Sequence, residues 1–102
     1  MTLVRTTPQA DEQAAHADGW WRENRQAAAA MFTDELVTAL ELLASTPEIG
    51  RRYRRAGIPG LRRLLMPGTS YHAYYVYDAD ADEVVVLAVW SAVRGRGPSL
   101  RP

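Results

Sequence analysis

Seven consecutive apolar residues, 84–90 (VVVLAVW), constrain the fold of this chain more than any other feature. They favour a strand, and the run is far shorter than the roughly 20 residues that a membrane-spanning helix needs. Side chains along a strand point alternately to the two faces of a sheet. A strand that is apolar at every position must therefore be covered on both faces, so we predict that this strand lies inside a sheet.

Two segments before this run also favour strands. The first covers residues 61–66 and ends at a turn formed by Pro67 and Gly68. The second covers residues 71–78, which include five aromatic or β-branched side chains, and an acidic turn at residues 80–83 follows it. The short connections predict two consecutive hairpins, which together make an antiparallel meander.

The chain opens with a short β-favouring segment at residues 2–6 that leads directly into a helix. Thr7 is a suitable N-cap, and Pro8 is suited to the first helical position. The helix is expected to run from residue 8 to about residue 25.

A second helix is predicted from Thr33, which we interpret as its N-cap, to about residue 46. Phe32 is placed to pack against Val37 across the helix start. Pro47 ends the helix because a proline disfavours helical geometry at the residue before it. The short link to the first helix predicts an antiparallel helical hairpin.

This order predicts the α+β class: a two-layer sandwich with the order strand, helix, helix, strand, strand, strand. The helical hairpin packs on one face of a mainly antiparallel four-stranded sheet. Residues 1–102 form one domain, with an irregular tail at residues 94–102. Two explanations stay open for the cover on the other face: the tail with neighbouring tyrosines, or a segment of a partner protein, which we favour.

Charge is unevenly distributed along the chain. Residues 1–50 hold three arginines and eight acidic residues, a balance of −5, whereas residues 51–102 hold nine arginines and four acidic residues, a balance of +5. The chain has no cysteine, which excludes disulfides and thiolate metal sites, and it opens without a secretion signal. We expect a cytoplasmic protein that needs no metal or cofactor and does not enter a membrane.

Three blocks occur in the same order as in a known family. They are WWRENR at 20–25, then GLRRLL at 60–65 with YHAYYVYD at 71–78, and then VLAVW at 86–90 ahead of RGRGP at 94–98. In these blocks the chain resembles toxins of the RelE/ParE superfamily, especially the ParE-like plasmid-stabilisation branch. The resemblance implies the toxin of a type II toxin–antitoxin pair, held inactive by a cognate antitoxin whose C-terminal segment wraps around it.

Family members act in one of two ways: some cleave mRNA on the ribosome, and others poison DNA gyrase. For a nuclease, the resemblance implies roles for Arg62 or Arg63, His72 and Arg94. The proton-transferring residue that such nucleases carry near the C-terminus has no counterpart after Arg94. We therefore favour gyrase as the partner and expect the chain itself not to bind a specific DNA sequence. Ribosome and mRNA remain the alternative.

Candidate binding residues follow from this interpretation. Arg62, Arg63, Arg94 and Arg96 are expected to contact the target, and the exposed sides of Tyr74, Val86 and Trp90 to contact the antitoxin.

Other interpretations of the same residues remain possible. His72 can be a half-buried strand residue rather than a proton carrier, and the tyrosines at 71, 75 and 77 can be core residues rather than a base-stacking row. A plain interaction domain that forms a homodimer through the second sheet face is a third possibility for the whole chain.

Overall fold

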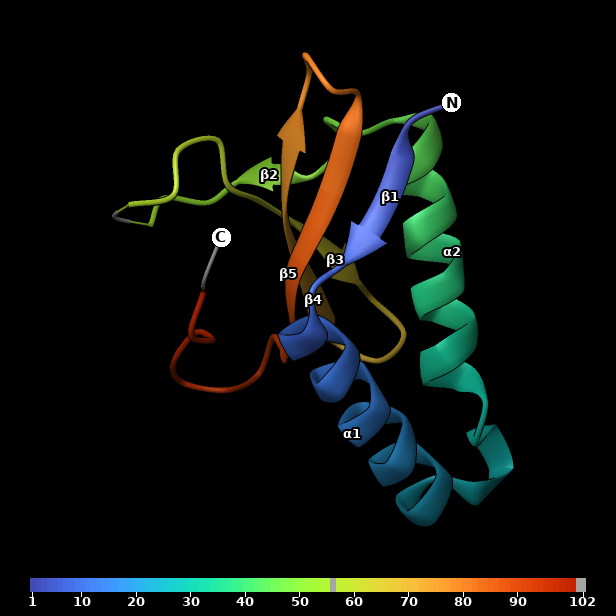
Figure 1. The fold of residues 1–102 in the computed structure, drawn as a ribbon. Helices are drawn as coiled ribbons and strands as arrows, with labels where there is room; N and C mark the ends of the chain where they lie inside the picture. The colour runs from blue at the N-terminus through green and yellow to red at the C-terminus, as the bar shows by residue number, and fades with distance from the viewer. Residues whose placement is uncertain (56, 101–102) are drawn as a thin grey trace.

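The computed structural model describes residues 1–55 and 57–100, in which two helices pack on an open five-stranded sheet (Figure 1). The α+β prediction is confirmed. In chain order the elements are β1 (Leu3–Thr6), α1 (Pro8–Asn24), a short 3-10 turn (Gln26–Ala28), α2 (Met31–Ser45), β2 (Arg51–Arg52), β3 (Arg62–Met66), β4 (Tyr71–Asp78) and β5 (Glu83–Ser91).

The sheet has the strand order β1-β5-β4-β3-β2. The two predicted hairpins are present, with β4 antiparallel to both β3 and β5, and β1 adds to the outer side of β5 in parallel. The prediction of four strands is wrong because β2, only two residues long, pairs with the start of β3. Both residues of β2 are arginines, so no apolar alternation marks it as a strand.

The start of α1 agrees with the sequence. The Thr7 hydroxyl accepts a hydrogen bond from the Ala10 amide at 3.1 Å, and Pro8 occupies the first turn. Thr7 also fastens the helix to the sheet, because its amide donates to the carbonyl of Val86 and its hydroxyl donates to the carbonyl of Leu87.

The predicted start of α2 is wrong. The helix begins at Met31, and the cap position is held by Ala30, which makes no side-chain hydrogen bond. The Thr33 hydroxyl instead donates to the carboxylate of Asp18 at 2.6 Å and so ties α2 to α1. This tertiary contact outweighs the local capping preference. Phe32 does not precede the helix cap as expected but lies within α2, where its side chain is buried in the main core, whereas the Val37 side chain is half exposed.

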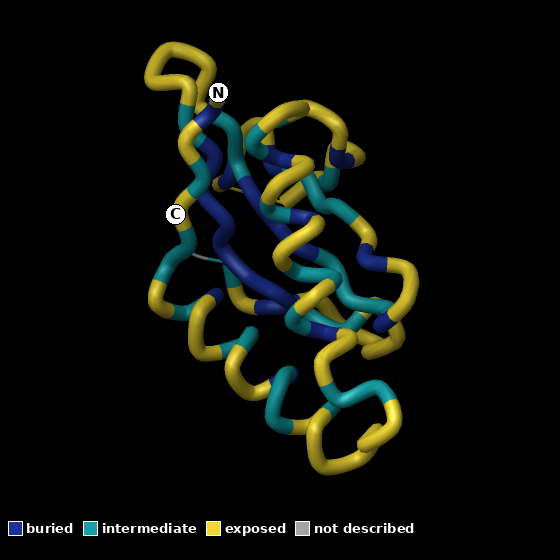
Figure 2. Tube along the Cα trace, turned by 90° about the vertical axis from the view of Figure 1, so that its right-hand side faces the viewer, coloured by how far each residue is buried: buried dark blue, intermediate teal, exposed yellow. Residues whose placement is uncertain are grey.

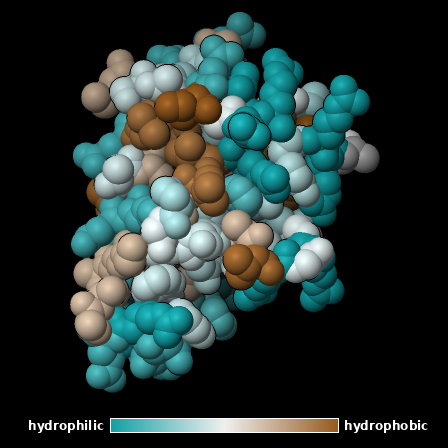
Figure 3. All heavy atoms as spheres, turned by 180° about the vertical axis from the view of Figure 1, so that it is seen from behind, coloured by the Kyte–Doolittle hydropathy of each residue, from teal (hydrophilic) through white to brown (hydrophobic). Residues whose placement is uncertain are grey.

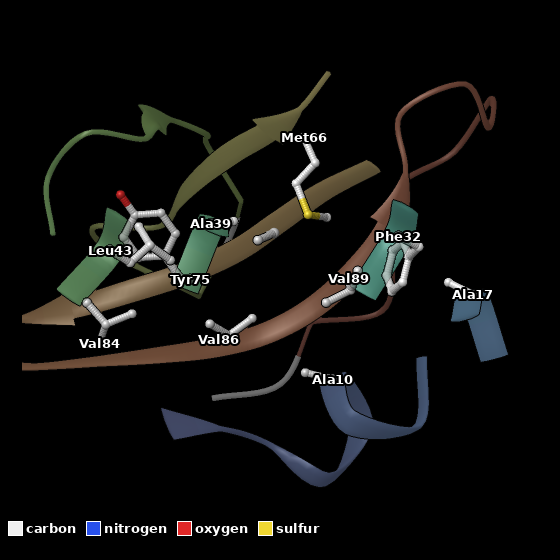
Figure 4. Close-up of a cluster of buried hydrophobic side chains, with 11 residues drawn as sticks. Ala10, Ala17, Phe32, Ala39, Leu43, Met66, Tyr75, Val84, Val86 and Val89 are labelled. Carbon is white, nitrogen blue, oxygen red and sulfur yellow. The ribbon is translucent and has the colours of Figure 1, made fainter. Parts of the chain in front are cut away.

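The helices cover one face of the sheet and enclose the main core, part of which is shown in Figure 4. Phe32 and Leu43 of α2 pack there against Met66, Tyr75 and a row of β5 valines, namely Val84, Val86 and Val89. Tyr71 and Tyr77 pack against the same core, which confirms the interpretation of the odd-numbered tyrosines as core residues. Figure 2 shows that the central strands are the most deeply buried part of the chain.

The opposite face of the sheet is covered by the chain itself. Its buried residues form a second core: Ile58, Leu61, Tyr74, Val85, Leu87 and Ala88. Tyr53, before the loop that carries Ile58, and Leu100 of the C-terminal tail pack against this core. Figure 1 shows the loop and the tail together on the side of the sheet away from α2. The favoured explanation, a partner segment covering an open second face, is therefore wrong for this part of the sheet.

The apolar run of β5 is covered on both faces, and a β-bulge interrupts its alternation. Tyr74 is opposite Ala88 and Tyr75 is opposite Val86, so Leu87 has no partner on β4. Leu87 and Ala88 consequently both belong to the second core, although they are consecutive residues. The bulge places Val86 and Trp90 on opposite faces.

Candidate functional site

A hollow of about 220 Å³ lies on the second face of the sheet, where β3, β4 and β5 meet the C-terminal tail. Its walls combine arginine, histidine and aromatic side chains with the tail backbone. The lining residues are Tyr53, Arg63, His72, Tyr74, Trp90, Ser91, Ala92, Arg94, Gly95, Arg96 and Gly97. We refer to it below as the basic hollow.

Strand pairing brings the central side chains of the hollow together. Arg63 of β3 is opposite Tyr74 of β4, and His72 of β4 is opposite Trp90 of β5. Because side chains two residues apart share a face, His72 and Tyr74 both point to the side opposite the helices. The sheet is thus a rigid base for groups that lie far apart in the sequence.

Arg63 is held by an aromatic ring. Its guanidinium carbon lies 4.5 Å from the centre of the Tyr53 ring, which packs edge-on against Tyr74 at 5.3 Å. The backbone of Tyr53 is tied to the start of β3, since the Tyr53 amide donates to the carbonyl of Leu61 at 2.9 Å. Tyr53 was missed at the sequence level; its only signal is an aromatic side chain between pairs of arginines.

The arginines of the basic hollow have no carboxylate partner. The ion pairs within residues 1–55 and 57–100 join Arg5 to Glu83, Arg22 to Asp18 and Arg62 to Glu48. Arg63, Arg94 and Arg96 belong to none of them. Three uncompensated guanidinium groups around one concave surface favour binding of phosphate or carboxylate groups.

His72 forms part of the floor of the hollow. Its ring packs edge-on against Tyr74 at 5.8 Å, and its Nδ1 atom is buried without a hydrogen-bond partner among the described residues. Burial lowers the pKa of His72 below its ordinary value, and the positive charge of Arg63 lowers it further. Both effects favour the neutral form of the imidazole over the charged form.

The tail closes the remaining side of the hollow. The Arg94 guanidinium lies 4.4 Å from the centre of the Trp90 ring, and the Trp90 indole N–H donates to the carbonyl of Arg96 at 2.8 Å. Farther along, Arg55 donates to the carbonyl of Pro98 at 2.9 Å. The tail has no regular secondary structure, yet side chains from β5 and from the loop after β2 hold it.

Arg62 does not line the basic hollow, so the structure does not bring it together with Arg63, and its role in target binding stays a prediction. It donates to the backbone carbonyls of Glu48 at 3.0 Å and Gly50 at 2.8 Å. These bonds hold the segment between α2 and β2, which gives Arg62 a structural role.

Two of the three residues expected at an antitoxin surface are buried. Val86 has no exposed surface and lies in the core under the helices, and Tyr74 is 3% exposed in the second core. Neither offers an exposed side to a partner. The role of Trp90, which is partly exposed, in antitoxin binding stays a prediction.

A second hollow, of about 410 Å³, lies between α1 and the end of β5. Gln9, Gln13 and His16 of α1 line it together with Tyr71, Trp90 and Arg94. Trp90 and Arg94 thus form a wall that both hollows share. Within the described part of the chain, no three His, Cys, Asp or Glu side chains cluster as a metal would require, and no helix is long and apolar enough to cross a membrane.

Residues 4–95 match the sequence model of a family described as the ParE toxin of the type II toxin–antitoxin system parDE. Among solved structures, the chromosomal ParDE system of P. aeruginosa is similar with a TM-score of 0.67 and 17% identity, over 89% of this chain and 96% of that one. The RelBE2 toxin–antitoxin complex of Mycobacterium tuberculosis has a TM-score of 0.58 and 20% identity, over 88% and 96%. The intact E. coli RelBE complex has a TM-score of 0.56 and 17% identity, over 92% and 100%. No curated protein sequence matches the chain significantly.

Proposed function

Because the chain belongs to the ParE toxin family of type II toxin–antitoxin systems, we propose that it stops growth by poisoning DNA gyrase and that a cognate antitoxin neutralises it. The observation that carries the choice of gyrase is the composition of the basic hollow. It presents three unpaired arginines, and the sequence after Arg94 holds no side chain that could transfer a proton near pH 7. Such a surface is suited to binding more than to cleavage.

Electrostatics support an inhibitor that binds through the hollow. Arg63, Arg94 and Arg96 approach from a strand and from the tail and converge on one concave surface. A cluster of like charges attracts an acidic protein surface or a DNA backbone and speeds the encounter. A complex of gyrase with DNA offers both.

The test is a supercoiling assay with purified gyrase, relaxed plasmid and increasing amounts of the purified chain. We expect supercoiling to fall and cleaved DNA to accumulate. The triple variant Arg63→Ala/Arg94→Ala/Arg96→Ala should be inactive, and Arg22→Ala, which removes an exposed arginine of α1, should act like the parent. Undiminished supercoiling at a large excess of the folded parent would overturn the proposal.

One observation favours a ribosome-dependent mRNA endonuclease as the second candidate. The same hollow contains His72, a neutral imidazole beside Arg63, and the phenol of Tyr53. An imidazole that accepts a proton next to arginines that stabilise a phosphate is a workable arrangement for RNA cleavage. Cut transcripts on purified ribosomes, lost in His72→Gln, would establish this candidate in place of the first.

The antitoxin is proposed to cover apolar surface outside the second core. Seen from behind, the molecule shows a hydrophobic patch bordered by hydrophilic side chains (Figure 3). Large hydrophobic side chains with substantial exposure include Val37 and Leu42 of α2, Ile49 after it and Leu65 of β3. Exposed apolar patches of this kind mark protein interaction sites. Hydrogen exchange with and without the antitoxin tests the idea: protection should appear in α2 and β3, and unchanged exchange in both would contradict it.

A further inference from the structure

We propose that Trp90 is a positioning residue, which holds the C-terminal tail so that Arg94 and Arg96 remain at the basic hollow. The inference rests on the proposed function only in that it takes the hollow to be the surface that meets the target. It assigns Trp90 a role within the chain itself.

Two separate parts of the indole make two separate contacts. The N–H group donates to the carbonyl of Arg96 at 2.8 Å and fixes the tail backbone. The ring face carries the Arg94 guanidinium at 4.4 Å and fixes a side chain. Tryptophan is the side chain that combines a single N–H donor with the aromatic face that binds cations best.

The tail needs such a restraint at this place. Residues 92–97 are exposed, and the sequence from Arg94 to Gly97 alternates arginine with glycine. Glycine loses more conformational freedom on ordering than any other residue, and long arginine side chains add to the cost. Without contacts to the sheet, both guanidinium groups would sample a large volume and face the hollow only part of the time.

The tail is anchored again beyond this segment. Pro98 is buried, its carbonyl accepts from Arg55, and the carbonyl of Ser99 accepts from the side-chain Nε2 of Gln9. Trp90 therefore controls a short span between β5 and Pro98. Its loss should free the arginines locally while the end of the tail stays in place.

Trp90 is itself held firmly enough to act as a support. It lies near the end of β5, opposite His72 in the register with β4, and packs against the second core. It also forms part of the wall between the two hollows. A rigid strand thus determines where an irregular tail presents its charges.

The test compares purified Trp90→Phe and Trp90→Leu with the parent chain, with Trp20→Phe as the matched control at an exposed tryptophan of α1. Phenylalanine keeps the ring face and loses the donor; leucine loses both. In NMR relaxation measurements, the backbone amides of Gly95 and Gly97 should become more mobile on the picosecond-to-nanosecond timescale in both Trp90 variants. The upfield ring-current shift of the Arg94 side chain should persist in Trp90→Phe and vanish in Trp90→Leu.

Growth inhibition on induction is the second measurement. Loss of an exposed cation–π contact lowers binding affinity by about two- to fivefold. Growth inhibition should therefore become weaker in the order parent, Trp90→Phe, Trp90→Leu. Trp20→Phe should match the parent, and circular dichroism should show all four proteins folded.

Two results would overturn the proposal. Unchanged Gly95, Gly97 and Arg94 signals in Trp90→Leu would show that Trp90 does not hold the tail. A released tail with undiminished growth inhibition would show that restraint of the tail is not needed for action on the target. If gyrase is unaffected by the parent while Trp90→Leu still inhibits growth less, the gyrase proposal fails and the positioning role stands.

Discussion

Arg62 and Arg63 are consecutive residues of β3, and their side chains lie on opposite faces of the sheet. Arg62 binds the carbonyls of Glu48 and Gly50 on one side, and Arg63 stacks on Tyr53 on the other. One arginine thus supports the fold and its neighbour faces the basic hollow. Substitution of each should therefore change a different property.

For Arg62→Ala we expect a loss of stability. Two hydrogen bonds from a charged donor disappear, and the free energy of unfolding should fall by about 1–3 kcal/mol. Urea denaturation followed by circular dichroism measures the change. Growth inhibition per folded molecule should not change, and a complete loss of inhibition in a folded variant would contradict a structural role.

For Arg63→Ala the expectation is reversed. The partly buried side chain supports Tyr53 only through a cation–π contact, so the denaturation midpoint should move little. Growth inhibition should fall about tenfold or more, because arginine is enriched among the few residues that dominate the binding energy of an interface. Inhibition equal to that of the parent would remove Arg63 from the site.

Arg94→Ala/Arg96→Ala tests the tail. Both side chains are exposed and lie outside the ion pairs of the described residues, so the fold should be unaffected. Growth arrest should require a much higher inducer dose, whereas Arg5→Ala/Arg22→Ala, which also removes two exposed arginines, should behave like the parent. Undiminished arrest would show that the tail does not contact the target.

His72 makes stability depend on pH. Its folded pKa is lowered from 6.5, first by burial and then by Arg63, so the unfolded chain binds more protons at this residue between the two pKa values. The His72 contribution to the free energy of unfolding is therefore complete above pH 6.5 and falls as the pH drops toward the folded pKa. His72→Gln should lose less stability than the parent between pH 7.5 and pH 5.5, with His16→Gln as the control for loss of one imidazole.

An NMR titration measures the same property directly. The His72 midpoint should lie below 6.5 and should rise in Arg63→Ala, because the neighbouring positive charge is gone. A midpoint that stays in place after this substitution would show that Arg63 does not act on His72.

Tyr75→Phe should destabilise the fold without changing the basic hollow. The Tyr75 hydroxyl accepts a hydrogen bond from the buried Gly50 amide at 2.8 Å, and an unpaired buried amide costs about 1–3 kcal/mol. Gly50→Ala should also lower the free energy of unfolding, because a Cβ atom there would lie 2.6 Å from the Tyr75 hydroxyl. The control Gly19→Ala, in α1 where a Cβ meets nothing within 4 Å, should raise the melting temperature.

The strands that are delimited by strong turn signals in the sequence were predictable. The interval 71–78 was predicted with the bounds of β4, because Pro67-Gly68 and the acidic turn delimit it. β2 was not predictable, since two exposed arginines become a strand only through their pairing with β3. The start of α2 was misplaced because the Thr33 hydroxyl binds a side chain of another helix, a contact that local sequence does not encode.

The candidate site was predictable only in part. Arg63, His72, Arg94 and Arg96 were named from the sequence, and all four line the basic hollow. Val86 was misplaced because counting alternate residues back from Trp90 assigns both to one face, and the bulge at Leu87 reverses that assignment. No pattern in the sequence predicts a one-residue bulge inside an apolar run.

The parallel pairing of β1 with β5 has a consequence for the life of the newly made chain. Leu3 pairs with Glu83 and Thr6 with Val86, so the opening strand leaves the ribosome long before its neighbour in the sheet exists. The sheet is therefore complete only after β5 has been made, and the arginines at 94 and 96 follow β5 in the chain. The basic hollow combines residues of β3, β4, β5 and the tail, so it can form only after that point, and a partner that recognises the hollow meets it no earlier.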